Sequence, residues 1–168
     1  MKVALGSKII EGPWGGGNNF IKNFSNFLKK KDCEVYHELK IKDLDIILLT
    51  DPREKSKSAS FNHFDVYNYI KKINKDTIVV HRINECDERK NTKDVNNQIA
   101  LANRFSDYTV FISKWLSEIF SNHLKKKSSS VIYNGANLEI FFNNSLNFTK
   151  KEKFKLVTHH WSNHKNKG

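Results

Sequence analysis

The sequence predicts an α/β protein with a Rossmann-like, doubly wound parallel sheet and helices on both of its faces. Short apolar segments alternate with helix-patterned segments at roughly 20 to 30 residues per unit, which is typical of β-α-β units with right-handed crossovers. The segment 46–49 is apolar without alternation, as expected for a parallel strand covered on both faces. A Gly-rich loop, residues 12–20, follows the first apolar segment. Nucleotide-binding α/β folds have their phosphate site at that position.

In chain order, the apolar segments predict six strands, at residues 2–7, 34–39, 46–49, 77–83, 108–112 and 130–133. Helices are predicted where apolar residues recur at helical spacing, and they begin near Phe20, Phe64, Val95 and Trp115. Asn18 or Asn19 is the expected N-cap of the first helix, and Ser113 is that of the last. The polar segment between residues 84 and 94 is expected to be a loop.

The chain is expected to contain one complete domain. Residues 1–142 form the predicted Rossmann-like domain, and the polar segment 143–153 reads as a linker. Residues 154–168 are expected to begin a further domain with one more strand and a strand-to-helix loop, and that domain is truncated here. A length of 168 residues suffices for one sizeable core and falls short of two full domains.

The composition is strongly basic, with a formal net charge of +11. Such a charge attracts nucleic acid, anionic lipid or phosphorylated ligands, and abundant lysine and asparagine are equally what an AT-rich genome produces. Cys33 and Cys86 are too few for a disulfide framework, which fits a reducing compartment. The sequence has neither a run of about 18 apolar residues nor a signal-peptide pattern. We therefore expect a cytoplasmic protein, or one peripheral on the inner face of the membrane.

The Gly-rich loop is the predicted phosphate-binding element, and its residues are Gly15, Gly16, Gly17 and Asn18. Glycine can adopt positive φ angles and lets a phosphate approach the backbone closely. The helix that follows would direct its free N–H groups toward a bound anion. The alternative is a flexible surface connection. The spacing Gly-x-Gly-x-x-Gly is absent, so ordinary dinucleotide binding is not indicated.

Polar residues follow the third and fourth predicted strands, where ligands of doubly wound sheets bind. Ligand contacts are expected from Asp51, Arg53, Arg82, Asn84, Asp87, Glu88 and Arg89. The two carboxylates Asp87 and Glu88 suit hydroxyl groups of a ligand, and the guanidinium groups of Arg82 and Arg89 suit a phosphate. His81 is the candidate catalytic residue, as a polar contact to the ligand. The alternative for His81 is a histidine whose hydrogen bonds are satisfied at the end of a strand.

The order of these motifs resembles the glycosyltransferases of the glycosyltransferase-B fold, in particular the large retaining family four. The carrying segments are residues 12–20, His81 to Asn84 with Glu85 to Arg89, and Val131 to Asn137 with Phe141. Family members commonly have Asp where this chain has Asn137. The resemblance covers the whole chain and implies the N-terminal half of a glycosyltransferase-B fold, which binds the acceptor.

By this resemblance, the protein transfers a sugar from a nucleotide-sugar to a saccharide or lipid-linked acceptor in cell-surface polysaccharide or lipopolysaccharide synthesis. It also implies that the ligand contacts expected above are contacts with the acceptor and the sugar, and that residues 154–168 begin a truncated nucleotide-sugar-binding domain. Asn134, Gly135, His159 and Trp161 would line the cleft between the two domains. The donor's diphosphate contacts belong mostly to the second domain, so this fragment is expected to be inactive. No cofactor is implied, and no metal either. His160 and His164 have the spacing of a helical metal pair, but no acidic or cysteine third ligand stands near them.

The alternative function is a non-catalytic, basic Rossmann-like module that binds nucleic acid or an anionic membrane. Nucleic acid is the less favoured partner, because the aromatic residues fall on amphipathic stripes that predict a core position. Those residues are Phe20, Phe24, Phe27, Phe64 and Trp115. Lys29 to Lys31 and Lys125 to Lys127 could contact anionic lipid.

Overall fold

The computed structural model describes residues 1–12, 15–52, 57–124 and 128–138. The strands are β1 (Lys2–Leu5), β2 (Glu34–Tyr36), β3 (Ile46–Leu49), β4 (Ile78–Ile83), β5 (Tyr108–Phe111) and β6 (Ser128–Val131). The helices are α1 (Gly16–Lys29), α2 (His63–Lys72), α3 (Asp87–Lys90), α4 (Val95–Asn103) and α5 (Lys114–Phe120). Internal contacts divide the chain into Met1–Asn134 and Gly135–Gly168. All of these elements belong to the first unit.

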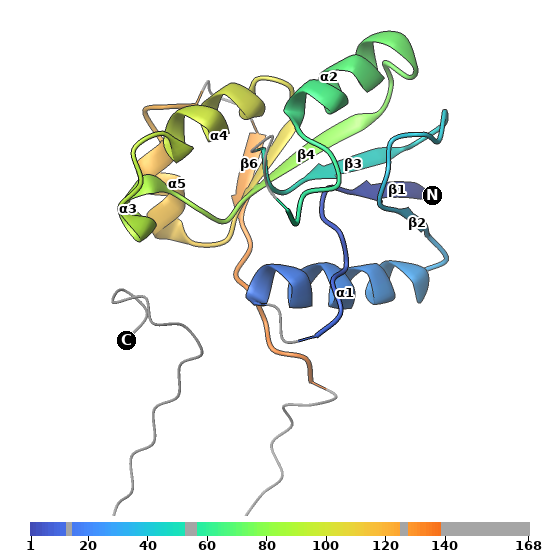
Figure 1. Cartoon of the computed structure of the whole chain (residues 1–168), viewed down its shortest axis with the longest axis horizontal. Helices are drawn as coiled ribbons and strands as arrows, with labels where there is room; N and C mark the ends of the chain where they lie inside the picture. The colour runs from blue at the N-terminus through green and yellow to red at the C-terminus, as the bar shows by residue number, and fades with distance from the viewer. Residues whose placement is uncertain (13–14, 53–56, 125–127, 139–168) are drawn as a thin grey trace, which may run out of the picture. The chain divides into compact units, whose positions relative to one another are not determined.

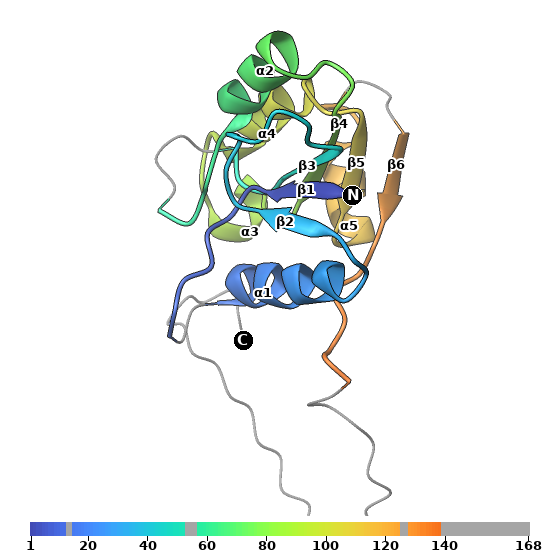
Figure 2. The same ribbon diagram turned by 90° about the vertical axis from the view of Figure 1, so that its right-hand side faces the viewer.

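The six strands form one sheet in the order β2-β1-β3-β4-β5-β6, and every neighbouring pair is parallel. Helix α1 lies on one face of this sheet, and α2 and α4 lie on the other (Figures 1 and 2). The structure thus confirms the predicted Rossmann-like, doubly wound α/β fold. Because all strands run in the same direction, their carboxyl ends meet at a single edge of the sheet.

Alternating residues of the central strands supply the two faces of the core. Leu5, Leu48 and Val80 pack with Ile21 and Leu28 of α1, forming an apolar layer on one face of the sheet. On the other face, a layer beneath α2 contains Ala4, Ile47, Leu49, Val66, Tyr69 and Val79. A third group joins α4 and α5 to the ends of β4 and β5 through Ile83, Ile99, Phe111, Leu116 and Phe120. Burial on both faces explains why β3 has no polar alternation.

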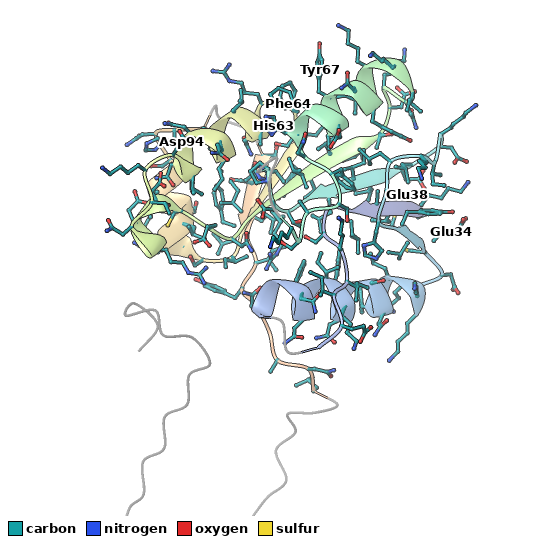
Figure 3. The ribbon with its side chains drawn as sticks, viewed as in Figure 1. Glu34, Glu38, His63, Phe64, Tyr67 and Asp94 are labelled. Carbon is teal, nitrogen blue, oxygen red and sulfur yellow. The ribbon has the colours of Figure 1, made fainter. Side chains whose placement is uncertain are left out.

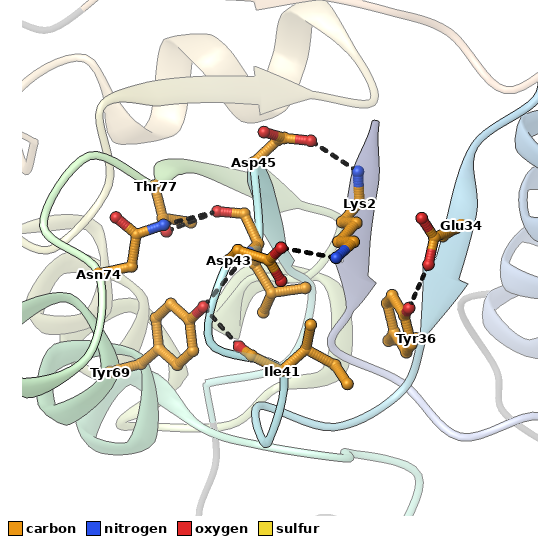
Figure 4. Close-up of polar contacts among 10 residues, drawn as sticks. Lys2, Glu34, Tyr36, Ile41, Asp43, Asp45, Tyr69, Asn74 and Thr77 are labelled. Carbon is orange, nitrogen blue, oxygen red and sulfur yellow. Dashed lines mark hydrogen bonds and ion pairs between the residues drawn. The ribbon is translucent and has the colours of Figure 1, made fainter.

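The amino edge of the sheet is closed by hydrogen bonds between α2, its neighbouring turns and the segment before β3 (Figure 4). The Tyr69 hydroxyl donates to the carbonyl of Ile41 at 2.6 Å and accepts the N–H of Leu44 at 3.1 Å. The Leu44 carbonyl accepts from Thr77 Oγ1 at 2.7 Å and Asn74 Nδ2 at 3.2 Å. These bonds satisfy backbone groups that the chain buries just before β3.

The predicted boundaries differ from the structure in several places. β1 ends at Leu5, because Ser7 forms an isolated antiparallel bridge with Ala59. β6 begins at Ser128 and ends at Val131, two residues earlier than predicted at each end. The predicted loop 84–94 contains the short helix α3. Ser113 is confirmed as the N-cap of α5, since its Oγ accepts the N–H of Leu116 at 3.2 Å.

The prediction that all stripe aromatics belong to the core is wrong for three residues. Phe27, Phe64 and Trp115 retain 54%, 44% and 48% of their surface exposed. Each lies at the margin of an apolar stripe, where periodicity cannot distinguish the core side from the solvent side. No described helix is long and apolar enough to cross a membrane.

Gly6 connects β1 to the loop, and a side chain at this position would collide with its surroundings. A Cβ atom there would lie 2.8 Å from the Leu48 carbonyl oxygen and 3.2 Å from Phe61 Cε2. We expect Gly6→Ala to lower the free energy of unfolding by about 1 to 3 kcal/mol, because backbone atoms must move to relieve the overlap.

Urea denaturation followed by circular dichroism measures this loss, with Gly16→Ala as the matched control. A Cβ at Gly16 meets no atom within 4 Å, so the control should be neutral or stabilising by less than about 1 kcal/mol. Equal stability of Gly6→Ala and the wild type would contradict the close packing at Gly6.

Candidate ligand site at the carboxyl edge of the sheet

β1 and β3 are neighbours whose following connections run in opposite directions along the sheet. Such a topological switch point is where doubly wound proteins bind their ligands. The first polar residues after the two strands meet here, with Ser7 Oγ and Thr50 Oγ1 2.6 Å apart. Asp51 follows directly, is partly buried and is engaged in further contacts. The structure therefore places Asp51 at the predicted edge.

The chain after β3 folds back over the end of β1. The N–H of Lys8 donates to the carbonyl of Ser58 at 2.8 Å, and the N–H of Ser60 donates to the carbonyl of Gly6 at 3.2 Å. From the other side, His37 Nδ1 lies 2.7 Å from the carbonyl oxygen of Ser7. The backbone at the switch point is thus held from both sides.

Helix α1 starts earlier than predicted, and its N-cap is Gly15 instead of Asn18 or Asn19. Asn18 has another role: its Oδ1 accepts the N–H of Ile10 and its Nδ2 donates to the carbonyl of Ile10, both at 2.9 Å. This pair of bonds fixes the loop onto the first turn of α1. Gly15 to Gly17 do not use the positive φ that glycine permits, because Gly15 has φ −63° and the next two residues are helical. Among the described residues of this loop, Gly12 has a positive φ, at 95°.

Arg82, near the end of β4, is only 6% exposed. Its Cζ atom lies 3.7 Å from the centroid of the Phe20 ring of α1, in a cation–π contact. Its Nη2 donates to Asn134 Oδ1 at 2.9 Å. Burial lowers the pKa of Arg82 to about 10, so the guanidinium stays charged at neutral pH. Arg82 therefore joins β4, α1 and the segment after β6 at the carboxyl edge.

His81 is completely buried on the face of β4 opposite to Arg82. Its Nδ1 lies 3.3 Å from Asn103 Nδ2, which also donates to Thr109 Oγ1 at 2.8 Å. Asn103 and Thr109 are themselves buried, so the three side chains form a polar group inside the domain. This placement puts His81 inside the domain, and its contact with a ligand stays a prediction.

Asp87 organises the loop between α3 and α4. Its carboxylate accepts Thr92 Oγ1 at 2.6 Å and the N–H groups of Val95 and Asn96, both at 3.0 Å. Glu88 accepts the Asn96 side-chain amide at 3.1 and 3.2 Å. Asp87 thereby caps α4, since the N-cap residue Asp94 makes no side-chain cap bond. Both predicted acceptor carboxylates are committed to the loop itself.

Arg89 is also held within its own loop. Its Nη1 donates to the carbonyl of Asn84 at 2.9 Å, and its Nε lies 3.9 Å from Glu85 Oε1. Asn84 itself is partly buried directly after β4. The two predicted phosphate-binding arginines therefore differ: Arg89 has a carboxylate neighbour, and Arg82 has none among the residues that the structure describes.

The sequence analysis did not single out His63, which stands with Phe64 and Tyr67 at the start of α2 (Figure 3). Its Nδ1 lies 3.1 Å from the carbonyl oxygen of Pro52, so this nitrogen must carry the proton. Its Nε2 is fully enclosed and has no hydrogen-bond partner in the described structure. His63 thus fastens the segment after β3 to α2, and no short-range pattern predicts this long-range contact.

Some predicted residues lie outside the described part of the chain. They are Arg53, His159 and Trp161, the histidines His160 and His164, and the segments 143–153 and 154–168. Asn134 belongs to the first unit, whereas Gly135 begins the second and is exposed. The described residues contain no cluster of three His, Cys, Asp or Glu side chains that could hold a metal.

No family model matches the sequence, and no curated protein matches it either.

The contacts of Asp87 predict a stability effect that depends on pH. Desolvation raises its pKa, but hydrogen bonds from Thr92, Asn96 and Val95 lower it more, so the net shift is downward. The stabilisation is therefore present above the unfolded pKa of about 3.9 and is lost as pH falls through the lower folded value. We expect Asp87→Asn to lower the free energy of unfolding by about 1 kcal/mol at pH 7.

Urea denaturation of wild type and Asp87→Asn at pH 7 and pH 3 checks this, and the difference should shrink at the lower pH. Asp94→Asn is the matched control, because that side chain makes no cap bond to the α4 backbone. A larger loss from Asp94→Asn than from Asp87→Asn would contradict the assignment of Asp87 as the cap.

Proposed function

We propose that this chain is the acceptor-side domain of a retaining glycosyltransferase of the glycosyltransferase-B fold. The enzyme would transfer a sugar from a nucleotide-sugar to a saccharide or lipid-linked acceptor in cell-surface polysaccharide or lipopolysaccharide synthesis. The observation that carries the proposal is the convergence of polar groups at the carboxyl edge of a parallel sheet, beside the start of α1. The resemblance of the motif order to family four supplies the reaction class.

The residues at this edge suit the task of holding an acceptor. Asp51 and Asn84 follow neighbouring strands and offer oxygen and amide groups for sugar hydroxyls. Arg82 offers a positive charge for a phosphate of a lipid-linked acceptor. The amides at the start of α1 would face developing negative charge on the departing diphosphate. In this proposal, most contacts with the nucleotide-sugar come from a second domain, and His159 and Trp161 line the cleft between the two domains.

The chain alone is expected to bind nucleotide-sugars only weakly, with Kd in the millimolar range, about −4 kcal/mol, and to transfer no sugar. The physical reason is that the diphosphate, sugar and ribose contacts of the donor come mostly from the other side of the cleft. Calorimetry with uridine, guanosine and adenosine diphosphate sugars measures the affinity, and incorporation of radiolabelled sugar into the acceptor measures transfer.

Acceptor binding provides the positive arm of the same test. Lipid-linked saccharides should bind the wild type, and Asn84→Ala should weaken them, whereas Asn26→Ala on the exposed side of α1 should not. Micromolar nucleotide-sugar binding, or turnover by the chain alone, would place the donor site in this domain and contradict the proposal.

A lipid-linked acceptor also requires approach to a membrane, and α1 has a surface that suits it. The helix contains no acidic residue, and its exposed Phe27 is followed, after the buried Leu28, by Lys29, Lys30 and Lys31. An exposed aromatic side chain among lysines is typical of peripheral binding to anionic lipid.

Binding to phosphatidylserine-containing liposomes should therefore exceed binding to neutral liposomes and fall as salt rises, since charge contacts are screened within about 10 Å at 0.1 M. Phe27→Ser should weaken this binding, and Phe64→Ser, on α2 across the sheet, is the matched control. Tight, salt-resistant binding to duplex DNA or RNA would instead favour the alternative of a nucleic-acid-binding module.

A further inference from the structure

Arg82 is a buried charge that has no anionic partner among the described residues. Only 6% of its surface is exposed to solvent. No carboxylate lies beside it among the described residues. Its described polar partner is the neutral amide oxygen of Asn134. Buried arginines are ordinarily paired with an anionic group, because removing an isolated charge from water is costly. The missing component at Arg82 is therefore a negative charge.

The geometry of Arg82 leaves donors available for such a charge. Stacking on Phe20 uses the flat face of the guanidinium, whereas its N–H groups point outward in the plane of the group. Phe20 is itself stacked on Phe24, with ring centroids 5.4 Å apart, so the platform is held in place. One nitrogen donates to Asn134, and no Arg82 nitrogen is among the fully enclosed, unpartnered atoms of the described chain. The free edge of the fork matches a phosphate group.

The start of α1 adds a second positive element at the same place. Phe20 is the fifth residue of the helix, and helical side chains lean toward the N-terminus, so the ring on which the guanidinium stacks belongs to the beginning of α1. That turn has no acidic residue and no side-chain cap. The N–H groups of Gly16 and Gly17 have no acceptor among the described residues, and both Cβ positions are open space. A cation beside the positive end of a helix dipole is unfavourable unless an anion lies between them.

We propose that Arg82, the Phe20 ring and the first turn of α1 form a binding site for a phosphate or diphosphate group, with Asn134 as the residue that positions the guanidinium. Only the assignment of that phosphate to a sugar-transfer substrate rests on the proposed function. Arg89 does not share this role, because Glu85 and the Asn84 carbonyl already occupy it.

Titration of the 168-residue chain with inorganic phosphate and pyrophosphate, by calorimetry and by thermal unfolding, tests the site. Pyrophosphate should bind more tightly than phosphate and should raise the melting temperature. Arg82→Met should weaken pyrophosphate binding at least tenfold. Without anion, its melting temperature should equal or exceed that of the wild type, because it removes an uncompensated charge. Arg89→Met is the matched control, and its pyrophosphate affinity should change less than twofold.

Gly16→Asp gives an independent test should Arg82→Met fail to fold. Its carboxylate would enter the open space at the first turn and provide the missing negative charge. We expect a higher melting temperature without anion and a loss of the increment that pyrophosphate gives. Vesicles of phosphatidylcholine with and without phosphatidic acid identify the source: a lipid phosphate is indicated when Arg82→Met, but not Arg89→Met, loses the binding that requires phosphatidic acid.

A wild-type chain that binds neither pyrophosphate nor phosphatidic acid overturns the anion site and leaves the proposed sugar transfer standing. Unchanged pyrophosphate affinity in folded Arg82→Met overturns it as well. Conversely, a chain that binds pyrophosphate through Arg82 but binds no saccharide or lipid-linked acceptor overturns the proposed function and retains the site.

Discussion

The parallel register of the sheet is the constraint from which the rest of the structure follows. It directs every strand's carboxyl end to one edge, so the residues after β1, β3 and β4 gather there although they are far apart in sequence. The amino edge is closed by short hydrogen bonds around Leu44 and Tyr69. At the carboxyl edge, the described donors of Arg82 and of the first turn of α1 are only partly satisfied. The two edges thus differ in how completely their polar groups are hydrogen-bonded. The proposed ligand site lies at the carboxyl edge, where N–H donors lack acceptors among the described residues.

Sequence periodicity predicts the fold well because apolar burial contributes most of the stabilising free energy, and each segment's own sequence pattern indicates which of its residues are buried. The segment 46–49 and the stripe on α1 each have the signature of their own burial, so their type could be assigned without knowledge of their neighbours. The ends of the strands and the capping residues of the helices could not be assigned in this way. Gly15 caps α1 because the amide of Asn18 is used by Ile10, and β1 ends early because Ser7 pairs with Ala59. Each of these outcomes depends on the path of another segment.

The site shows the same division between local and long-range information. The rule that ligands bind at carboxyl ends places Arg82 and Asn84 at the edge, but it does not indicate that Asp87 and Glu88 accept hydrogen bonds from their own loop. His81 and Arg82 are adjacent and equally polar in the sequence. Because side chains alternate along a strand, His81 lies beneath α4 and Arg82 faces α1. The residues that pack on each face decide whether a polar side chain there can bind a ligand. The role of each polar side chain therefore depends on the residues that other helices and strands bring into contact with it.

A domain that keeps a buried cation without a carboxylate neighbour sacrifices stability for binding. Stacking on Phe20 and one bond to Asn134 offset part of the desolvation cost of Arg82, while a carboxylate at the same place would offset more and would exclude an anionic ligand. Stability and affinity are then linked: an anion that binds only the folded chain stabilises it by about 2.7 kcal/mol at one hundred times its Kd. The two glycines that begin α1 fit this view, because Ala at Gly16 would strengthen the helix, whereas an acidic residue would neutralise the site. The incomplete electrostatics at this edge are thus a requirement of ligand binding, since a fully compensated Arg82 would have no reason to take up an anion.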